Sequence, residues 1–275
     1  MKAPAEPAAA RSPMSLTYPD WVVLHLPHDS VEIPAAVRGQ FLLNDADLTL
    51  ELRRMTDHLT LELFAHPASS TAVVRAPISR LVVDVERFED DTCEPMFARG
   101  MGAIYAVTSG LMPLRRQLQP SERDALMQAY YRPHHGRLEA AVSSAIEAHG
   151  RCTVIDCHSF PSMALPYEIA DADADAARPD ICIGSDDFHT RAELASAFVT
   201  TFQRARWRVS LNAPFAGALV PASRYLQDRR VSAVMVEVNR RLYLSEHDAK
   251  PLPTFADVAQ RVRNCCISAL ASCEP

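Results

Sequence analysis

The chain has 275 residues, 48% of them hydrophobic and 23% charged, a composition typical of a globular protein that can bury a substantial core. Its formal net charge of -6 leaves no excess of basic side chains to neutralise phosphates, so we expect no nucleic acid partner. No apolar run approaches the roughly 18 residues that can span a bilayer, so we also expect no association with a membrane.

The chain is predicted to form a flexible tail over residues 1–16 and a single domain over residues 17–275. Glu6 and three prolines interrupt the tail, which excludes a continuous apolar signal core. The seven cysteines are odd in number, scattered and without a CxxC pair, so we expect reduced thiols and a cytoplasmic protein. The acidic stretch at 170–177 is expected to be a solvated loop.

Short β-branched runs alternate with amphipathic helical patterns along the chain. This alternation predicts an α/β fold with helices on both faces of a sheet. In chain order we expect a strand at Trp21–Leu26, a helix at Ala46–Leu63, strands at Ala72–Ala76 and Leu81–Val85, a helix at Ser121–His149, a strand at Thr153–Cys157, a helix at Arg191–Arg206, strands at Arg208–Leu211 and Ala233–Val238, and a helix at Thr254–Ala271.

Polar side chains stand where four of these strands end. In open α/β sheets, binding and catalysis collect beyond the carboxyl ends of the strands, so such residues are the candidates for function. In chain order they are His28, then Asp84, Glu86 and Arg87, then Asp156, His158 and Ser159, and finally Glu237 and Arg240.

Two histidines and a carboxylate match the ligands of a catalytic zinc ion, which leaves one position for water. Such an ion lowers the pKa of water, and a free carboxylate can then serve as general base. A buried Glu237 would need a compensating charge nearby, as this arrangement supplies. Taken singly, His28 or His158 would more often be a hydrogen-bonded structural histidine. Ser159 could be a nucleophile, but no GxSxG turn surrounds it.

Several motifs in order resemble the N-formylglutamate amidohydrolase family over about residues 20–245. The resemblance is carried by PHDSVEIP (27–34), MTDHLTLELF (55–64), SRLVVDVERFEDD (79–91), YYRPHHGRL (130–138), IDCHSFP (155–161), ICIGSDDF (181–188), PFAGALVP (214–221) and VEVNRRLY (236–243). It implies a three-layer sandwich with a mixed central sheet, of the phosphorylase/hydrolase-like type of the zinc carboxypeptidases. It also implies hydrolysis of N-formyl-L-glutamate to formate and L-glutamate, a reaction of histidine degradation.

The resemblance implies one zinc ion per chain, held by His28, Asp57 and His158, with Asp57 supplied by the first long helix. Glu32, four residues after His28, is the rival third ligand. Glu237 would be the general base.

Four arginines, Arg80, Arg87, Arg132 and Arg240, could hold substrate carboxylates or polarise the scissile carbonyl, since guanidinium groups bind carboxylates in a bidentate fork. Each is equally well placed as a structural ion-pair partner. Three histidines stay outside the predicted site. His25 is expected to pack or to support the site indirectly. His134 and His135 are expected to contact substrate or groups that support the site, or equally well to lie on the surface.

The chain departs from the family where deformylases usually read DLNR, because it has Asp-Val-Glu-Arg at 84–87. A deacylase or carboxypeptidase-like enzyme acting on another small N-acyl amino acid is therefore the alternative function. A non-catalytic domain that binds a small ligand is the second alternative. Imidazole and carboxylate ligands also suit iron, nickel or cobalt, so the metal stays open, as does the oligomeric state.

Overall fold

A six-stranded mixed sheet forms the centre of the computed structural model, which describes residues 17–67, 69–168 and 178–273. The strand order is β2-β1-β3-β6-β4-β5, with β4 antiparallel to β6 and the other neighbouring pairs parallel. The strands are β1 (Val22–Leu26), β2 (Ala72–Arg75), β3 (Cys152–Phe160), β4 (Ile181–Gly184), β5 (Val209–Leu211) and β6 (Val231–Asn239). The expected tail at 1–16 and the expected acidic loop at 170–177 lie entirely outside the described residues.

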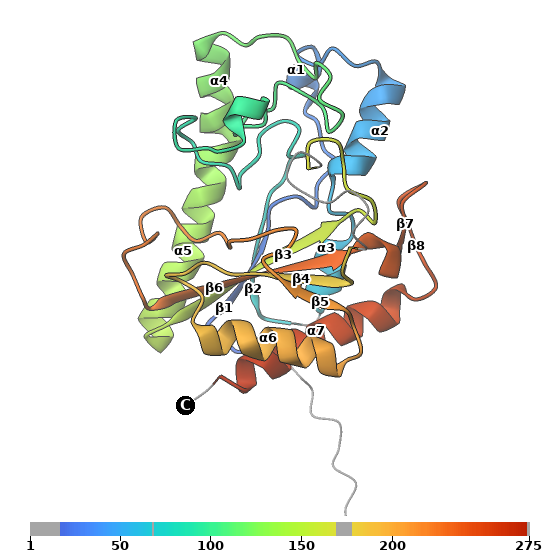
Figure 1. The fold of residues 1–275 in the computed structure, drawn as a ribbon. Helices are drawn as coiled ribbons and strands as arrows, with labels where there is room; N and C mark the ends of the chain where they lie inside the picture. Colours follow the sequence, from blue (N-terminus) through green and yellow to red (C-terminus); the bar gives the residue numbers. More distant parts are fainter. Residues whose placement is uncertain (1–16, 68, 169–177, 274–275) are drawn as a thin grey trace, which may run out of the picture.

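Helices cover both faces of the sheet, which confirms the predicted three-layer fold (Figure 1). Helix α5 (Arg132–His149) packs on β1, β2 and β3 from one side. Helices α3 (Thr60–Phe64), α6 (Ala192–Arg204) and α7 (Phe255–Ala271) cover the other side. Because side chains alternate along a strand, Val154 of β3 joins the core beneath α5, whereas Ile155 joins the core beneath α6 and α7.

A third core is formed by side chains from residues 37–55 and 76–131, at the carboxyl end of β1 and β3, where Figure 1 shows the irregular segments gathered. The remaining elements are α1 (Ala35–Arg38), α2 (Asp45–Met55), η1 (Phe97–Arg99), α4 (Pro120–Leu126), the π-helical η2 (Met127–Tyr131), η4 (Arg240–Leu242), β7 (Leu244–Ser245) and β8 (Lys250–Pro251). Loops at this end of the sheet position the polar groups described below.

The expected helix at 46–63 is interrupted between α2 and α3. The backbone N–H of Asp57 donates to the carbonyl of His28 at 2.9 Å, and Leu59 adopts a left-handed φ of 64°. A contact to another part of the fold therefore replaces local helical hydrogen bonding. The helix predicted at 121–149 is present as three successive segments, α4, the π-helical η2 and α5.

The expected strand at 81–85 is wrong. Leu81, Val82, Val83 and Val85 are buried, but the segment is a turn rather than part of the sheet. The guanidinium of Arg115 donates to the carbonyls of Leu81 and Val82, which a neighbouring strand would otherwise satisfy. The short strand β4 was not among the predicted strands, because a run of four residues is a weak pattern.

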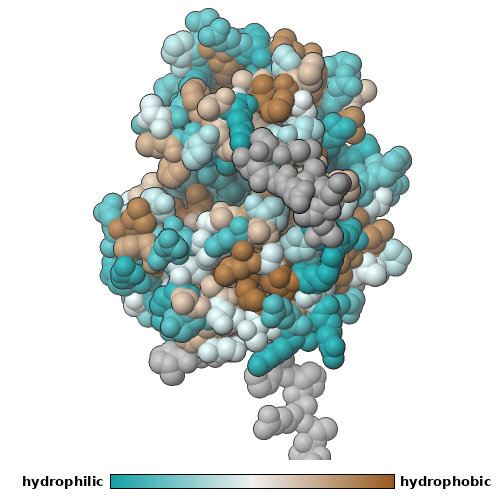
Figure 2. All heavy atoms as spheres, viewed as in Figure 1, coloured by the Kyte–Doolittle hydropathy of each residue, from teal (hydrophilic) through white to brown (hydrophobic). Residues whose placement is uncertain are grey.

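Polar side chains dominate the face seen in Figure 2, with apolar side chains in separate patches. Within the described ranges, no helix combines the length and the hydrophobicity needed to cross a bilayer. All seven cysteines fall within these ranges, and none forms a disulfide.

Replacing Arg115 with Met should lower the free energy of unfolding by about 1–3 kcal/mol, because two buried carbonyls lose their donor while the removed charge no longer has to be desolvated. Urea denaturation measures this change. Arg116→Met is the control, since Arg116 pairs with Glu122 in an exposed position and should cost less than about 1 kcal/mol. Equal losses in the two variants would contradict the structural role of Arg115.

Candidate metal centre

Three buried side chains from separate parts of the chain converge at the carboxyl end of the sheet. They are His28 after β1, Asp57 between α2 and α3, and His158 on β3, with potential ligand atoms all within 4.8 Å of one another. Asp57 Oδ2 lies 3.0 Å from His158 Nδ1 and 3.7 Å from His28 Nδ1. Ligands bound at roughly 2.0–2.1 Å in a tetrahedron stand about 3.3 Å apart, so the three atoms could share one ion.

His28 has a ring nitrogen without a hydrogen-bond partner in the described part of the chain. Its Nε2 is 2.8 Å from Asp84 Oδ1, and since a carboxylate only accepts, Nε2 carries the proton. The Nδ1 lone pair then faces the cluster, buried and without a hydrogen-bond partner among the described residues. A buried acceptor left unpaired is costly, and a metal ion would satisfy it.

His158 also turns its Nε2 toward carboxylates, 3.2 Å from Asp156 Oδ1 and 3.1 Å from Glu86 Oε1. Unlike that of His28, its Nδ1 has a partner, since it hydrogen-bonds to the Asp57 carboxylate. Metal-binding histidines usually donate their second N–H to a carboxylate in this manner, which fixes the ring and raises its basicity. The surroundings of both imidazoles therefore fit a metal ion.

Arg240 fixes the carboxylate of Asp57. Its Nη2 donates to Asp57 Oδ1 at 2.9 Å, and its other donors reach Ser159 and the carbonyl of Arg54. Burial opposes ionisation of Asp57, but the adjacent imidazoles of His158 and His28, together with the charge of Arg240, hold its pKa well below the usual range. The donors of Arg240 are thus engaged within the protein.

Asp84 anchors His28 and has both oxygens occupied. Oδ1 accepts from His28 Nε2 and from the backbone N–H of Glu86, and Oδ2 accepts from Arg80 and from the hydroxyl of Tyr105. Arg80 is therefore the ion-pair partner of Asp84, one of the two roles that the sequence left open. Tyr105 lies in an irregular segment and had no sequence signal.

Arg87 is different, because its guanidinium makes only long contacts. It lies 3.6 Å from Asp84 Oδ2 and 3.8 Å from Glu94 Oε1, and its Nε is buried without a hydrogen-bond partner among the described residues. The side chain is 24% exposed, so a small anion could reach it. Of the four candidate arginines, Arg87 has the donors best placed for a ligand.

Two predicted candidates lie apart from the cluster. The Arg132 guanidinium pairs with Glu89 and Asp124 in a largely exposed position. Glu32 is exposed, and its recorded contacts are made through its backbone. The geometry therefore favours Asp57 over Glu32 as the third ligand, and the assignment of roles stays a prediction.

Glu237 stands beside His158, since the two are register partners on the adjacent strands β6 and β3. It is 7% exposed, and its Oε2 is buried without a hydrogen-bond partner in the described part of the chain. Burial raises the pKa of Glu237 to about 8, opposed by His158 and assisted by the charges of Asp57 and Glu86. Such a carboxyl can exchange a proton near neutral pH.

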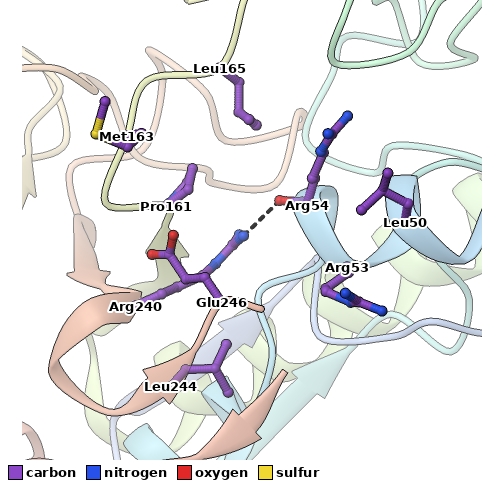
Figure 3. A pocket seen from close by; sticks show the side chains of 9 residues that line it. All are labelled: Leu50, Arg53, Arg54, Pro161, Met163, Leu165, Arg240, Leu244 and Glu246. Atoms are coloured by element: carbon purple, nitrogen blue, oxygen red, sulfur yellow. Dashed lines mark hydrogen bonds between the residues drawn. The ribbon is translucent and has the colours of Figure 1, made fainter. Parts of the chain in front are cut away.

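A pocket of about 220 Å³ adjoins the cluster across Arg240 (Figure 3). Its walls come from α2, from the segment that follows β3, and from the region of η4 and β7, and none of the three clustered residues lines it. Figure 3 shows Arg240 on its inner wall, donating to the carbonyl of Arg54. The volume suits a small molecule.

Two histidines outside the predicted site lie directly behind it. His25 and His134 are each 0% exposed, so His25 does pack behind the site and His134 is not a surface residue. The spacing of His134, Leu138 and Val142 places them on one stripe of α5, and all three are buried. That four-residue spacing was the signal that could have identified His134 as an interior residue.

The comparisons with known proteins agree with one another. The family model described as N-formylglutamate amidohydrolase matches residues 21–244. An N-formylglutamate deformylase from Pseudomonas putida is 26% identical over 256 residues, covering 87% of this chain and 86% of that protein. The crystal structure of N-formylglutamate amidohydrolase from Ralstonia eutropha JMP134 superposes with a TM-score of 0.78 at 20% identity, covering 94% of this chain and 95% of that one. A gene product of Agrobacterium tumefaciens gives 0.65 at 22% identity, covering 93% and 92%.

The Glu237→Gln substitution should change how stability depends on pH in the metal-free protein. The folded-state pKa of about 8 exceeds the ordinary 4.5, so between these values only the folded protein keeps the proton, and wild-type stability falls as pH rises through this window. Gln does not titrate. The unfolding free energy of the variant minus that of wild type should therefore rise from about pH 5 and level off above about pH 8, as urea melts at several pH values can measure. A difference independent of pH would contradict the buried, unpaired state of Glu237.

Proposed function

Because the chain belongs to the N-formylglutamate amidohydrolase family, we propose that it is a zinc-dependent enzyme that hydrolyses N-formyl-L-glutamate to formate and L-glutamate. The observation that carries the proposal is the unpaired Nδ1 of buried His28, aimed at the same point as His158 Nδ1 and the carboxylate of Asp57. Leaving a buried polar set of this kind incomplete costs stability, and a cation would complete it.

His28, Asp57 and His158 would hold the ion. When bound, a zinc ion supplies Lewis acidity, which polarises an acyl carbonyl and lowers the pKa of water. The protein prepares the ligands for it: Asp84 and Asp156 keep each imidazole in the orientation that offers Nδ1, and Arg240 holds the carboxylate of Asp57. These contacts reduce the reorganisation needed on binding.

Glu237 is the general base in this proposal. It accepts a proton from the attacking water, whose oxygen bonds to the acyl carbon, and then delivers that proton to the departing nitrogen as the C–N bond breaks. Its position next to His158 and its raised pKa suit a group that must both take and give a proton near neutral pH. The unpaired Oε2 leaves one oxygen available for that exchange.

Arg87 would bind a carboxylate of the substrate, because its guanidinium is partly exposed and lacks short hydrogen bonds. The donors of Arg80 and Arg240 are engaged with Asp84 and Asp57, so we assign them to positioning. We assign Arg132 no direct role, since two surface carboxylates neutralise it.

A second candidate substrate is another small N-acyl amino acid with less negative charge. The observation in its favour is Glu86, whose carboxylate lies 3.1 Å from His158 Nε2 and adds negative charge beside the cluster. A panel of N-formyl, N-acetyl and N-succinyl amino acids, including glutamine derivatives, separates the two candidates by kcat/KM.

Glu237→Gln should bind zinc as wild type does and lose about 100-fold or more in kcat, because proton transfer by a positioned side chain contributes roughly 10²–10⁴ to the rate. Elemental analysis and release of formate from N-formylglutamate measure the two quantities. Chelator-treated wild type should be inactive and recover when zinc is added back.

A wild-type chain that purifies without metal and stays active after chelation would contradict zinc dependence. Metal binding without turnover of any substrate in the panel would favour a non-catalytic binding domain. Equal activity of Glu237→Gln and wild type would remove Glu237 from the mechanism.

Arg87→Met should raise KM for N-formylglutamate by about 10–100-fold with zinc content unchanged, because a charged hydrogen bond to substrate is worth about 1.5–3 kcal/mol. Steady-state kinetics measures the change, and Arg132→Met is the matched control with little expected effect. An unchanged KM in Arg87→Met, or an equal rise in the control, would show that Arg87 does not hold the substrate.

A further inference from the structure

A pair of buried histidines stands behind the proposed metal centre, and neither takes part in the roles assigned above. His25 lies on β1 and His134 on α5, with their Nε2 atoms 2.8 Å apart. One of two ring nitrogens at this distance must donate and the other accept. The neighbouring hydrogen bonds of the two rings, to Arg137 and to Asp156, fix which nitrogen donates.

At the outer end, the guanidinium of Arg137 lies 3.5 Å from His134 Nδ1. A guanidinium only donates, so Nδ1 of His134 must be the acceptor and its proton must sit on Nε2. Burial lowers the pKa of His134 to about 2, with His25 and His135 assisting, so the ring is neutral. His134 therefore donates through Nε2 to His25.

At the inner end, His25 Nδ1 is 2.7 Å from Asp156 Oδ1. The carboxylate only accepts, so the proton of His25 sits on Nδ1, and its Nε2 is free to accept from His134. Both ends thus give the same direction. His25 and Asp156 are also register partners on β1 and β3, so their side chains share one face of the sheet.

Asp156 connects the hydrogen-bonded pair of His25 and His134 to a proposed metal ligand. Its Oδ1 also lies 3.2 Å from Nε2 of His158, and its Oδ2 accepts from the backbone N–H of Leu219 at 2.9 Å. Both oxygens of the carboxylate are therefore held in place. Donors arrive from three separate segments: β1, β3 and the loop that contains Leu219.

We propose that His25 and His134 are positioning residues that act through Asp156 to hold His158 with its Nδ1 facing the metal. This inference rests on the proposed function, because it takes His158 as a ligand. Without the donor at His25 Nδ1, the Asp156 carboxylate loses the shortest of its three hydrogen bonds and can turn away from His158. Groups that orient a metal ligand in this way affect metal affinity without touching the ion.

A second ion held by His25, Glu86 and Asp156 is the competing interpretation, since their potential ligand atoms also lie within 4.8 Å of one another. The 2.7 Å between His25 Nδ1 and Asp156 Oδ1 argues against it. That distance is at the short end for a hydrogen bond and well below the about 3.3 Å that separates two ligands of one tetrahedral ion, whereas the 3.0 and 3.7 Å separations at Asp57 lie on either side of that value.

Two substitutions at the same buried position separate positioning from packing. The amide nitrogen of Asn replaces Nδ1 of histidine, so His25→Asn keeps the donor to Asp156. The amide of Gln reaches the Nε2 position, so His25→Gln keeps the contact with His134 and loses that donor. His134→Gln and His134→Phe form a corresponding pair, in which only Gln keeps a donor to His25.

His25→Gln should weaken zinc binding about 10–100-fold, as measured by chelator competition, and should alter the visible spectrum of the cobalt-loaded protein. His25→Asn should weaken zinc binding less than about 3-fold and leave that spectrum unchanged. His134→Phe should weaken zinc binding more than His134→Gln. Thermal unfolding of the metal-free variants checks that each pair is similarly folded. Equal affinities within the His25 pair, or two zinc ions per wild-type chain, would overturn the inference.

Nitrogen NMR of the histidine rings in the metal-free protein tests the same series of hydrogen bonds without relying on the metal. It should show neutral His25 protonated on Nδ1 and neutral His134 protonated on Nε2, and the Nε2 proton of His158 should exchange with solvent faster in His25→Gln than in His25→Asn. Reversed tautomers or equal exchange would overturn the positioning role. A wild-type chain that fails to bind zinc would instead contradict the proposed function, and the exchange rates would still decide whether His25 positions His158.

Discussion

The site depends on burying ionised carboxylates against histidines at the carboxyl end of the sheet. Asp57, Asp84 and Asp156 are each 2% exposed or less, and desolvation would drive them to the neutral form if they stood alone. Imidazole groups face each of them instead, guanidinium groups also face Asp57 and Asp84, and the pKa of each stays well below its usual range. The positions of the two histidines among the three candidate metal ligands follow from satisfying these buried charges.

The arrangement assigns a definite task to each ring nitrogen of His28 and His158. Carboxylates occupy the Nε2 atoms, so the Nδ1 atoms must face inward. For His28, the carboxylate at Nε2 and the lack of a hydrogen-bond partner for Nδ1 among the described residues select one tautomer. His158 instead has a carboxylate at each ring nitrogen, with Asp57 facing its Nδ1. The protein has therefore selected the ring orientation before any ion binds, at the cost of leaving His28 Nδ1 unpaired.

Glu237 shows the opposite treatment of a carboxyl group. Among the described residues no guanidinium or backbone N–H binds its Oε2, and burial raises its pKa instead of lowering it. Carboxyl groups a short distance apart thus differ in proton affinity because one set has donors and the other does not. Pairs of groups whose pKa values are pushed in opposite directions are a common feature of acid–base catalysis. The stability lost by leaving Glu237 unpaired is consistent with a functional reason for keeping it.

Much of this protein follows from its sequence, because the signals are local. Alternating apolar runs predicted most of the strands and all of the long helices, and polar residues at strand ends identified His28, His158 and Glu237 before their distances were known. The order of motifs gave the family, which the match over residues 21–244 confirmed. Local patterns suffice here because periodicity reflects which face of an element is buried.

Only the tertiary structure decided which polar groups pair with one another. The helix predicted across Asp57 is broken by a hydrogen bond to the carbonyl of His28, and the run at 81–85 is a turn because Arg115 satisfies its carbonyls. Whether Arg240 is engaged or available depends on Asp57, which lies 183 positions away in the sequence. Such pairings depend on three-dimensional proximity, which no local pattern encodes.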